Sequence, residues 1–257
     1  MPTLATWNVN SIRARRDRVL AWTERVRPDI LCLQEIKVTE EHFPFADFDA
    51  IGYEAAVYGQ KTYNGVAILS RTPICDIRRG LDDGVDDPQA RLLDAVVADQ
   101  RVLCVYVPNG REVGSDKYDY KLAWLERLRG YLERTASPEE ALLVCGDMNV
   151  APERRDAAFP DQWEGSVLCH EDARTALARV RAWGLADLYR ELHPDGTEYT
   201  WWDYRMLAFP KGNGVRIDHM LGTRTVADRS RRIWVDRDER KGTKPSDHAP
   251  VVLELGS

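Results

Sequence analysis

The sequence lacks any long hydrophobic run. Its apolar segments, such as residues 95–98, are short. None reaches the ~18 consecutive apolar residues that a transmembrane helix needs. The first twenty residues carry arginines, whereas a secretory signal peptide has an apolar centre. We therefore expect a cytoplasmic protein that does not enter a membrane.

Cysteine is also scarce. The chain has five cysteines, an odd number that does not fit a set of disulfide pairs, and none has the spacing of a zinc site. Cys32, Cys104 and Cys145 each lie inside an apolar segment. Because disulfide frameworks are typical of secreted proteins, these three residues predict reduced thiols in the core of an intracellular protein.

An excess of positive charge is missing as well. The chain has 36 lysines and arginines against 42 acidic residues, a formal net charge of −6 and a pI near 5.5. Typical DNA-binding domains are basic, so any affinity for nucleic acid must be local or assisted by a bound metal ion. No repeat, low-complexity tract or long flexible linker divides the chain, which predicts one domain over residues 1–257.

The apolar pattern alternates between strand-like and helix-like segments. Helices are expected over residues 11–26, 115–134 and 172–183. Strands are expected over residues 4–8, 29–34, 55–58, 66–70, 91–98, 101–107, 141–145, 215–221 and 250–255. So many strands would strain one small sheet, so we expect a layered α/β fold with two sheets.

Polar residues recur at or next to the ends of the apolar strands. Taken alone, each is as readily a turn residue, a helix cap or a surface acid. Buried carboxylates need a partner or a cation, so strand ends that meet at one rim would form a single acidic site. The residues in question are Asn8, Glu35, Tyr106, Asn109, Asp147, Asn149, Asp218, Asp247 and His248.

The residue types favour a hard divalent cation. Carboxylate and amide oxygens with few thiolates or histidines select Mg²⁺ or Mn²⁺ over zinc, and such a cation suits the hydrolysis of a phosphodiester. Glu35 and Asp247 are the best candidate anchors. Asp147 and Asn149 are two residues apart, and in extended backbone both side chains would point to one face, where they could hold water and a phosphate oxygen.

His248 is the histidine with candidate carboxylates on both sides. Asp247 precedes it in the sequence, and Asp218 can lie opposite it in space. A carboxylate that fixes the tautomer of an imidazole prepares it as a phosphate ligand or a general base. His248 is therefore predicted to act on the phosphate or on the attacking water.

These residues belong to a longer set of motifs that resembles the exonuclease III family of abasic-site DNA endonucleases, within the endonuclease/exonuclease/phosphatase superfamily. The resemblance runs in order from Leu4 to Leu255. Short pieces such as GDMN occur across the superfamily, whereas the combination is specific for the DNA-repair branch. The motifs are TWNVNSIR, PDILCLQEIK, YNGVAILSR, VYVPNG, KYDYKLAWLERL, GDMNVAP, TWWDYR, RIDHML and SDHAPV.

The resemblance implies a four-layer α/β sandwich, in which two packed mixed sheets are flanked by helices and the site lies at one rim. It also implies that water attacks the phosphorus in line on the 5′ side of the lesion and leaves a 3′-hydroxyl. Whether Asp147 takes up or gives the proton stays open. The implied catalytic residues are Tyr106, Asp147, Asn149, Asp218 and His248, and the implied metal-site residues are Asn8, Glu35, Asp147, Asn149, Asp247 and His248.

DNA contacts follow partly from charge and partly from the resemblance. Arginines crowd the start of the first helix, where they can contact phosphates. Trp201 with two apolar residues matches the pocket that accepts a baseless sugar, although Val215 is smaller than its usual counterpart. At position 10 an asparagine replaces the metal-linked aspartate of some relatives. The predicted DNA-binding residues are Asn10, Arg13, Tyr63, Asn109, Trp201, Val215 and Ile217.

The sequence thus predicts a Mg²⁺-dependent DNA-repair phosphodiesterase, with Mn²⁺ able to substitute. It would cleave duplex DNA 5′ to abasic sites and act as a 3′–5′ exonuclease and on blocked 3′-ends, as a monomer. One alternative keeps the fold and the metal but changes the substrate to RNA, a phosphoinositide or a sphingolipid. Another is a non-catalytic DNA-binding module, which would have no use for clustered acids that repel DNA.

Overall fold

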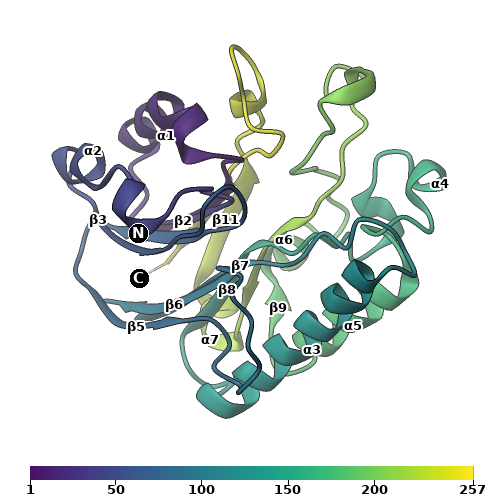
Figure 1. The fold of residues 1–257 in the computed structure, drawn as a ribbon, viewed down its shortest axis with the longest axis horizontal. Helices are drawn as coiled ribbons and strands as arrows, with labels where there is room; N and C mark the ends of the chain where they lie inside the picture. The colour runs from purple at the N-terminus through teal and green to yellow at the C-terminus, as the bar shows by residue number, and fades with distance from the viewer. Residues whose placement is uncertain (257) are drawn as a thin grey trace.

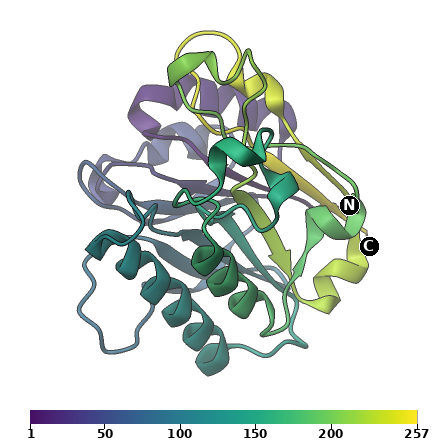
Figure 2. The same ribbon diagram turned by 90° about the vertical axis from the view of Figure 1, so that its right-hand side faces the viewer.

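The computed structural model describes residues 1–256, in which two six-stranded sheets pack face to face between layers of helices (Figure 1). The helices are α1 (Ile12–Val26), α2 (Phe45–Ala50), α3 (Asp116–Thr135), α4 (Pro160–Trp163), α5 (Glu171–Arg181), α6 (Leu188–Leu192) and α7 (Arg224–Arg229). Short 3₁₀ turns lie at Glu40–His42, Arg154–Asp156, Arg205–Leu207 and Arg237–Arg240. Figure 2 shows the sheets between α1 on one side and α3 with α5 on the other. The predicted four-layer sandwich is confirmed.

The first sheet has the order β11-β12-β1-β2-β4-β3. Its strands are β1 (Thr3–Asn8), β2 (Ile30–Gln34), β3 (Glu54–Tyr58), β4 (Val66–Ser70), β11 (Ser230–Val235) and β12 (Val251–Leu255). β1 and β2 run parallel because α1 connects them, and the other neighbours are antiparallel. The carboxyl ends of β1 and β2 therefore meet at one edge.

The second sheet has the order β5-β6-β7-β8-β10-β9. Its strands are β5 (Ile74–Arg79), β6 (Leu92–Val97), β7 (Gln100–Tyr106), β8 (Leu142–Asp147), β9 (Ala186–Asp187) and β10 (Asp218–Gly222). β7 and β8 run parallel, joined through α3, whereas β10 pairs with β8 in the antiparallel sense. This sheet too is mixed, as predicted.

Strand alternation places the site at the end of the core between the sheets. In β2, Ile30 and Cys32 face the other sheet, and in β8 Leu143 and Cys145 do the same. The next position of that face in β8 is Asp147, since side chains alternate with a period of two. The apolar core therefore gives way to polar side chains where the strands end.

The predicted core thiols are confirmed. Cys32, Cys104 and Cys145 are buried between the sheets, and the five cysteines, all within residues 1–256, are free. In the same part of the chain, no helix is both long enough and apolar enough to cross a membrane.

The strand expected over residues 215–221 starts too early. The observed strand β10 begins only at Asp218. The preceding N–H groups of Ile217 and Asp218 donate to the hydroxyl of Thr200, at 3.1 and 3.0 Å, instead of joining a strand ladder. Val215 forms only isolated bridges. This segment is irregular because its N–H groups bond to separate partners, the carbonyls of Trp201 and Asp156 and the hydroxyl of Thr200, and not to one neighbouring strand.

Three edge strands, β5, β9 and β11, were not expected from the sequence. β5 and β11 lie at the outer edges of their sheets and carry charged, exposed side chains. An edge strand buries little apolar surface, so its alternation is weak in the sequence. The predicted hairpin is present, but its turn is at Ala98 and Asp99, since Gln100 already pairs with Val97.

Candidate active site

Segments far apart in the sequence meet at one edge of the sheets. Asn8 ends β1, Glu35 follows β2 and Asp147 ends β8. Asp218 begins β10 and pairs with Asp147 in register, and His248 comes shortly before β12. The structure thus brings these five predicted site residues together.

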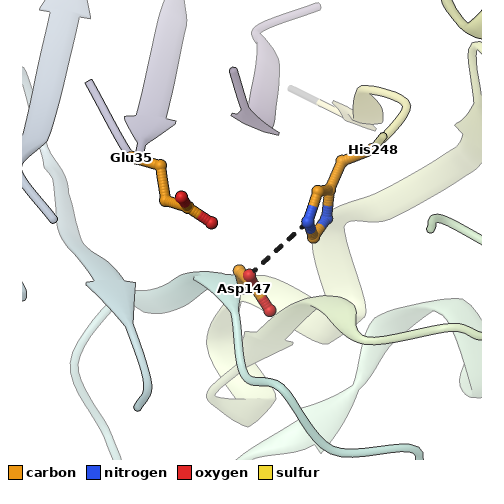
Figure 3. Close-up of side chains that lie close together, drawn as sticks. All are labelled: Glu35, Asp147 and His248. Atoms are coloured by element: carbon orange, nitrogen blue, oxygen red, sulfur yellow. Dashed lines mark ion pairs between the residues drawn. The ribbon is translucent and has the colours of Figure 1, made fainter. Parts of the chain in front are cut away.

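Glu35, Asp147 and His248 form the centre of this group (Figure 3). Each offers one ligand atom, and these atoms lie within 4.8 Å of one another. Nε2 of His248 is 3.8 Å from Oδ2 of Asp147. Two carboxylates and an imidazole at this spacing can hold a metal ion, with carboxylate oxygens suited to a hard divalent cation.

Asn8 ties the two carboxylates together. Its Nδ2 donates to Oε1 of Glu35 at 2.8 Å and to Oδ2 of Asp147 at 2.9 Å. Its Oδ1 accepts the backbone N–H of Asn10 at 3.0 Å. In this arrangement the amide nitrogen of Asn8, and not its oxygen, faces the centre of the site.

His248 is held by Asp218. Its Nδ1 lies 2.8 Å from Oδ2 of Asp218, and both side chains are buried. Burial alone would lower the pKa of His248, but the carboxylates of Asp218 and Asp147 outweigh it and raise that pKa to about 10. His248 is therefore an imidazolium at neutral pH, donating through Nδ1 and presenting Nε2–H to the site.

The pKa of Asp147 is also raised, but here burial is the largest cause. Burial raises its pKa, the charge of His248 lowers it, and the neighbouring carboxylates of Asp218 and Glu35 raise it again, which brings it to about 7. A group with a pKa near the working pH can both accept and donate a proton. Asp147 is thus suited to acid–base chemistry at neutral pH.

The centre of the site has an excess of negative charge. Among the described residues, Oδ1 of Asp218 is buried without a hydrogen-bond partner. A buried acceptor without a partner destabilises the fold, and three carboxylates outnumber the nearby cations of His248 and Lys37. Glu35, Asp147 and Asp218 therefore fit a site that gains a divalent cation.

Asp247 does not belong to the central group. Its Oδ2 accepts Nε1–H of Trp201 at 2.9 Å, and its Oδ1 accepts Nδ2–H of Asn10 at 2.9 Å. Burial would raise its pKa, but the charge of His248 and these two hydrogen bonds outweigh it and lower that pKa. Asp247 is thus a carboxylate with both oxygens bonded, and its role as a metal ligand stays a prediction.

The backbone after Asp147 is a tight turn, so the expectation of extended backbone up to Asn149 is wrong. Asn149 has a left-handed φ of 50°, and its N–H donates to Oδ1 of Asp147 at 2.9 Å. Its Oδ1 accepts Nδ2–H of Asn109 at 2.9 Å, and its Nδ2 donates to the carbonyl of Val107 at 3.0 Å. The turn, and not strand alternation, brings Asn149 to the site.

Tyr106 lies beside Asp147 in the strand register of β7 and β8. Burial of its hydroxyl, with the negative charges of Glu35 and Asp147, raises the pKa of Tyr106 well above its usual value. The guanidinium of Arg91 lies 4.7 Å from the centre of its ring. Tyr106 therefore stays neutral and can donate a hydrogen bond.

Lys37 was missed by the sequence analysis. Its Nζ lies 2.7 Å from Oε2 of Glu35 and donates to Oδ1 of Asn10 at 2.6 Å. Both Glu35 and Lys37 have left-handed φ angles, of 50° and 55°. A lysine two residues after a candidate ligand was the available signal, in the motif LQEIK.

Three predicted DNA contacts line open grooves at the surface. Arg13 is exposed and lines a groove of about 410 Å³ together with Arg16 and Lys244. Tyr63 is 65% exposed and, with Asn109, lines another groove of about 370 Å³. Cations also line this second groove, namely Arg91, Arg111 and Lys117. Both grooves carry positive charge despite the acidic pI.

The other arginines at the start of α1 are engaged within the protein. Arg15 donates to the carbonyls of Asn10 and Pro245 and to the hydroxyl of Tyr204. Arg18 forms an ion pair of 2.8 Å with Glu239. These contacts fasten the loop before β12 to α1, so they position the site.

The three residues of the predicted sugar pocket differ in exposure. Trp201 is half-buried and packs edge-on against Trp163, with ring centres 5.6 Å apart. Val215 and Ile217 are buried behind it, in a small cluster with Ala151 and other apolar residues. Among these three, Trp201 offers a surface, and the part of the other two in DNA binding stays a prediction.

Sequence and structure comparisons define the class of this protein. The model of the endonuclease/exonuclease/phosphatase family matches residues 5–248, nearly the whole chain. The chain therefore belongs to this family of hydrolytic enzymes, and the predicted resemblance is confirmed.

Within this family, the chain is similar to nucleases and a phosphatase that act on DNA ends or abasic sites, according to their names. The chain is 33% identical to exodeoxyribonuclease III of Haemophilus influenzae, over 97% of this chain and 98% of the relative. The structure of an AP endonuclease from Archaeoglobus fulgidus aligns with a TM-score of 0.97 and 43% identity, with all of both chains covered. A 3′ phosphatase from Neisseria, solved with a product DNA hairpin, aligns with a TM-score of 0.96 and 38% identity, again over all of both chains.

Proposed function

We propose that this chain is a Mg²⁺-dependent DNA-repair phosphodiesterase. It cleaves duplex DNA on the 5′ side of abasic sites and removes nucleotides or blocking groups from 3′-ends. It works as one domain over residues 1–257, as a cytoplasmic monomer. The convergence of Glu35, Asp147 and the Asp218–His248 pair at the end of the core between the sheets carries this proposal.

Each residue of the site has its own role in the proposed reaction. The imidazolium of His248, held by Asp218, faces the negative phosphate and stabilises charge that develops on its oxygens. Tyr106 donates a hydrogen bond to the same phosphate. Asp147, with a pKa of about 7, is the acid–base group of the in-line attack by water. Asn149, next to Asp147 in the turn, borders the path of that water.

Glu35 is the principal metal ligand in this proposal. Asp147 lies within reach of the same ion, and Asn8 and Lys37 hold Glu35 in place. His248 would ligate the ion only after losing its Nε2 proton, so as an imidazolium it serves the phosphate instead. A divalent cation bound there supplies positive charge that neutralises the phosphodiester and lowers the barrier to its cleavage. The predominance of oxygen ligands favours Mg²⁺, with Mn²⁺ as a substitute.

DNA is the proposed substrate because of the surroundings of the site and the relatives. Arg13 borders one basic groove, and Tyr63 and Asn109 border the other. Such grooves give an acidic protein local affinity for a phosphate backbone. Relatives that cover all or nearly all of the chain are named as an exodeoxyribonuclease, an AP endonuclease and a 3′ phosphatase bound to a DNA hairpin.

The test uses two labelled duplexes, one with a single internal tetrahydrofuran abasic analogue and one with an intact recessed 3′-end. Each is incubated with the protein in Mg²⁺ and in excess chelator, with Asp147→Asn as the matched inactive control. We expect one incision 5′ to the analogue, with a 3′-hydroxyl product, and slower shortening of the recessed end. Chelator and the substitution should each abolish both reactions.

Other outcomes separate the alternatives. Hydrolysis of RNA, a phosphoinositide or sphingomyelin with intact DNA would keep the family and reject the DNA substrate. Binding of abasic DNA without cleavage in any divalent metal would make the protein a binding module. Incision that persists in chelator would contradict the proposed metal site.

A further inference from the structure

Lys121 is a charged residue in an apolar helix face. On α3 the side chains of Tyr118, Leu125 and Leu128 pack against the second sheet, and Lys121 lies in the same stripe. Its side chain has no exposed surface. A lysine is almost never fully buried without a partner, because removing its charge from water destabilises the fold. Its position therefore needs an explanation that packing does not supply.

The ammonium group of Lys121 is bonded to three backbone carbonyls. Nζ donates to the carbonyl of Asn149 at 2.7 Å, to that of Asn109 at 3.2 Å and to that of Val167. Burial lowers the pKa of Lys121 to about 7, and the charge of Asp147 raises it in part. An ammonium group has three N–H bonds, so the three carbonyl acceptors match the capacity of the charged form and favour it. Asn109 and Asn149 are the two loop residues whose side chains bond to each other beside the site.

The loops that Lys121 joins need such support. Asn149 lies in a left-handed conformation, which a non-glycine residue seldom adopts unless its surroundings hold it. Gly110, next to Asn109, packs so closely on Lys121 that a Cβ atom there would lie 3.1 Å from Cδ of the lysine. The following carbonyl, of Val150, is held independently by Nε2 of His219 at 2.9 Å.

We propose that Lys121 is a positioning residue, whose ammonium group fixes the turn of Asn149 and the loop of Asn109 in the arrangement that the reaction requires. This inference rests on the proposed function, since it concerns the same site. It predicts that Lys121 affects the rate of the chemical step, through Asn149, much more than it affects DNA binding. Small displacements of a group beside the reacting atoms are known to reduce rates strongly.

The test compares Lys121→Met, which keeps the length of the side chain, with Tyr131→Phe. Tyr131 is a matched control because it is buried on the same helix and its hydroxyl donates to Asp94 at 2.7 Å, away from the site. Both substitutions remove buried hydrogen bonds from α3, and both should lower the Tm. We expect Lys121→Met to lower kcat about 10- to 100-fold with KM unchanged within about threefold, as for outer partners of other sites. Tyr131→Phe should keep the wild-type kcat.

A double-mutant cycle shows whether Lys121 acts through Asn149. In the Asn149→Ala background, Lys121→Met should lower kcat by less than about a third of the factor that it causes in the wild-type background, because the side-chain amide of residue 149 is then absent. An undiminished effect would contradict the inference. If Lys121→Met does not fold, Lys121→Gln, which keeps a donor for one carbonyl, enters the same cycle.

Failure of this inference can be told apart from failure of the proposed function. A wild-type protein that cleaves neither duplex rejects the proposed function. If the wild type is active and Lys121→Met keeps its kcat, only the inference about Lys121 is rejected. The same holds if Lys121→Met and Tyr131→Phe lower the Tm equally and also lower kcat equally.

Discussion

Two buried histidines, His248 and His219, show how the surroundings decide what a residue can do. His248 faces the carboxylates of Asp218 and Asp147, which raise its pKa to about 10 although burial lowers it. Burial and the charge of the neighbouring Arg216, whose Nη1 lies 3.0 Å from Nδ1, together lower the pKa of His219 to about 4. One histidine is therefore charged at neutral pH and the other is neutral.

The groups of charged residues around His219 and around His248 also differ in their charge balance. Arg216 forms ion pairs with Asp156 at 2.7 Å and with Asp187 at 2.9 Å, and Arg190 pairs with Asp156 at 2.8 Å, so two cations and two carboxylates near His219 compensate one another. Around His248 the carboxylates are in excess, and an oxygen of Asp218 has no partner among residues 1–256. A balanced buried cluster serves the structure, whereas an unbalanced one in a cleft is typical of a functional site.

The largest expected difference between the two clusters is in catalysis. We expect His248→Asn to lower kcat about 10³-fold, because the charged donor beside the phosphate is lost. His219→Gln should keep kcat within about threefold, since glutamine retains a donor for the carbonyl of Val150. Single-turnover cleavage of the abasic duplex measures both. Equal losses in the two variants would contradict the division between a functional and a structural cluster.

The second expected difference between the two clusters is in metal binding. Mg²⁺ should raise the Tm of the wild-type protein, because an ion that binds only the folded state stabilises it. Glu35→Gln should remove most of this increase and raise the Mg²⁺ concentration for half-maximal activity by roughly tenfold or more. Asp187→Asn, in the balanced cluster, serves as control and should leave the Mg²⁺ requirement unchanged. The same requirement in Glu35→Gln as in the wild type would remove Glu35 as a ligand.

The smallest effect concerns stability at low pH. The pKa of His219 falls from an ordinary value of 6.5 to about 4 on folding, so between these pH values the unfolded chain binds a proton that the folded chain does not. Stability is therefore full above pH 6.5 and decreases as the pH falls toward 4, by about 3 kcal/mol at about 1.4 kcal/mol per pKa unit. His219→Gln should flatten this decrease in urea unfolding between pH 4 and 6.5. An unchanged slope would show that another group is responsible.

His248 does not disturb that measurement. Its pKa is raised on folding, so its contribution to stability is fully present below pH 6.5 and is lost only as the pH rises toward 10. The two histidines thus act in separate pH ranges. His248→Asn should change the pH dependence of stability above pH 6.5.

The positions of the site residues could be predicted because apolar strands ended in polar side chains. Asn8, Glu35 and Asp147 each follow such a strand, and parallel neighbours bring strand ends to one edge. The structure places the Asp218–His248 pair as the sequence suggested. Period-two alternation and strand ends are local features, so the sequence reveals them.

Features that depend on contacts between distant loops could not be predicted. Asn10 bonds to Asp247 across 237 residues, which engages an oxygen that the sequence analysis had assigned to a metal. The left-handed turn of Asn149 and the burial of Lys121 depend on the packing of α3 against two loops. Nothing in the local pattern of charges or apolar residues distinguishes Lys121 from an exposed lysine.

The location of a bound divalent ion decides whether the carboxylates at the end of the core form a metal site. Crystals of this protein soaked in Mn²⁺ should show one strong anomalous peak within bonding distance of the carboxylates of Glu35 and Asp147, next to the Asp218–His248 pair. That result would join the metal to the residues that converge at the end of the core. Mn²⁺ bound only elsewhere, in a protein that still cleaves abasic DNA, would contradict the account.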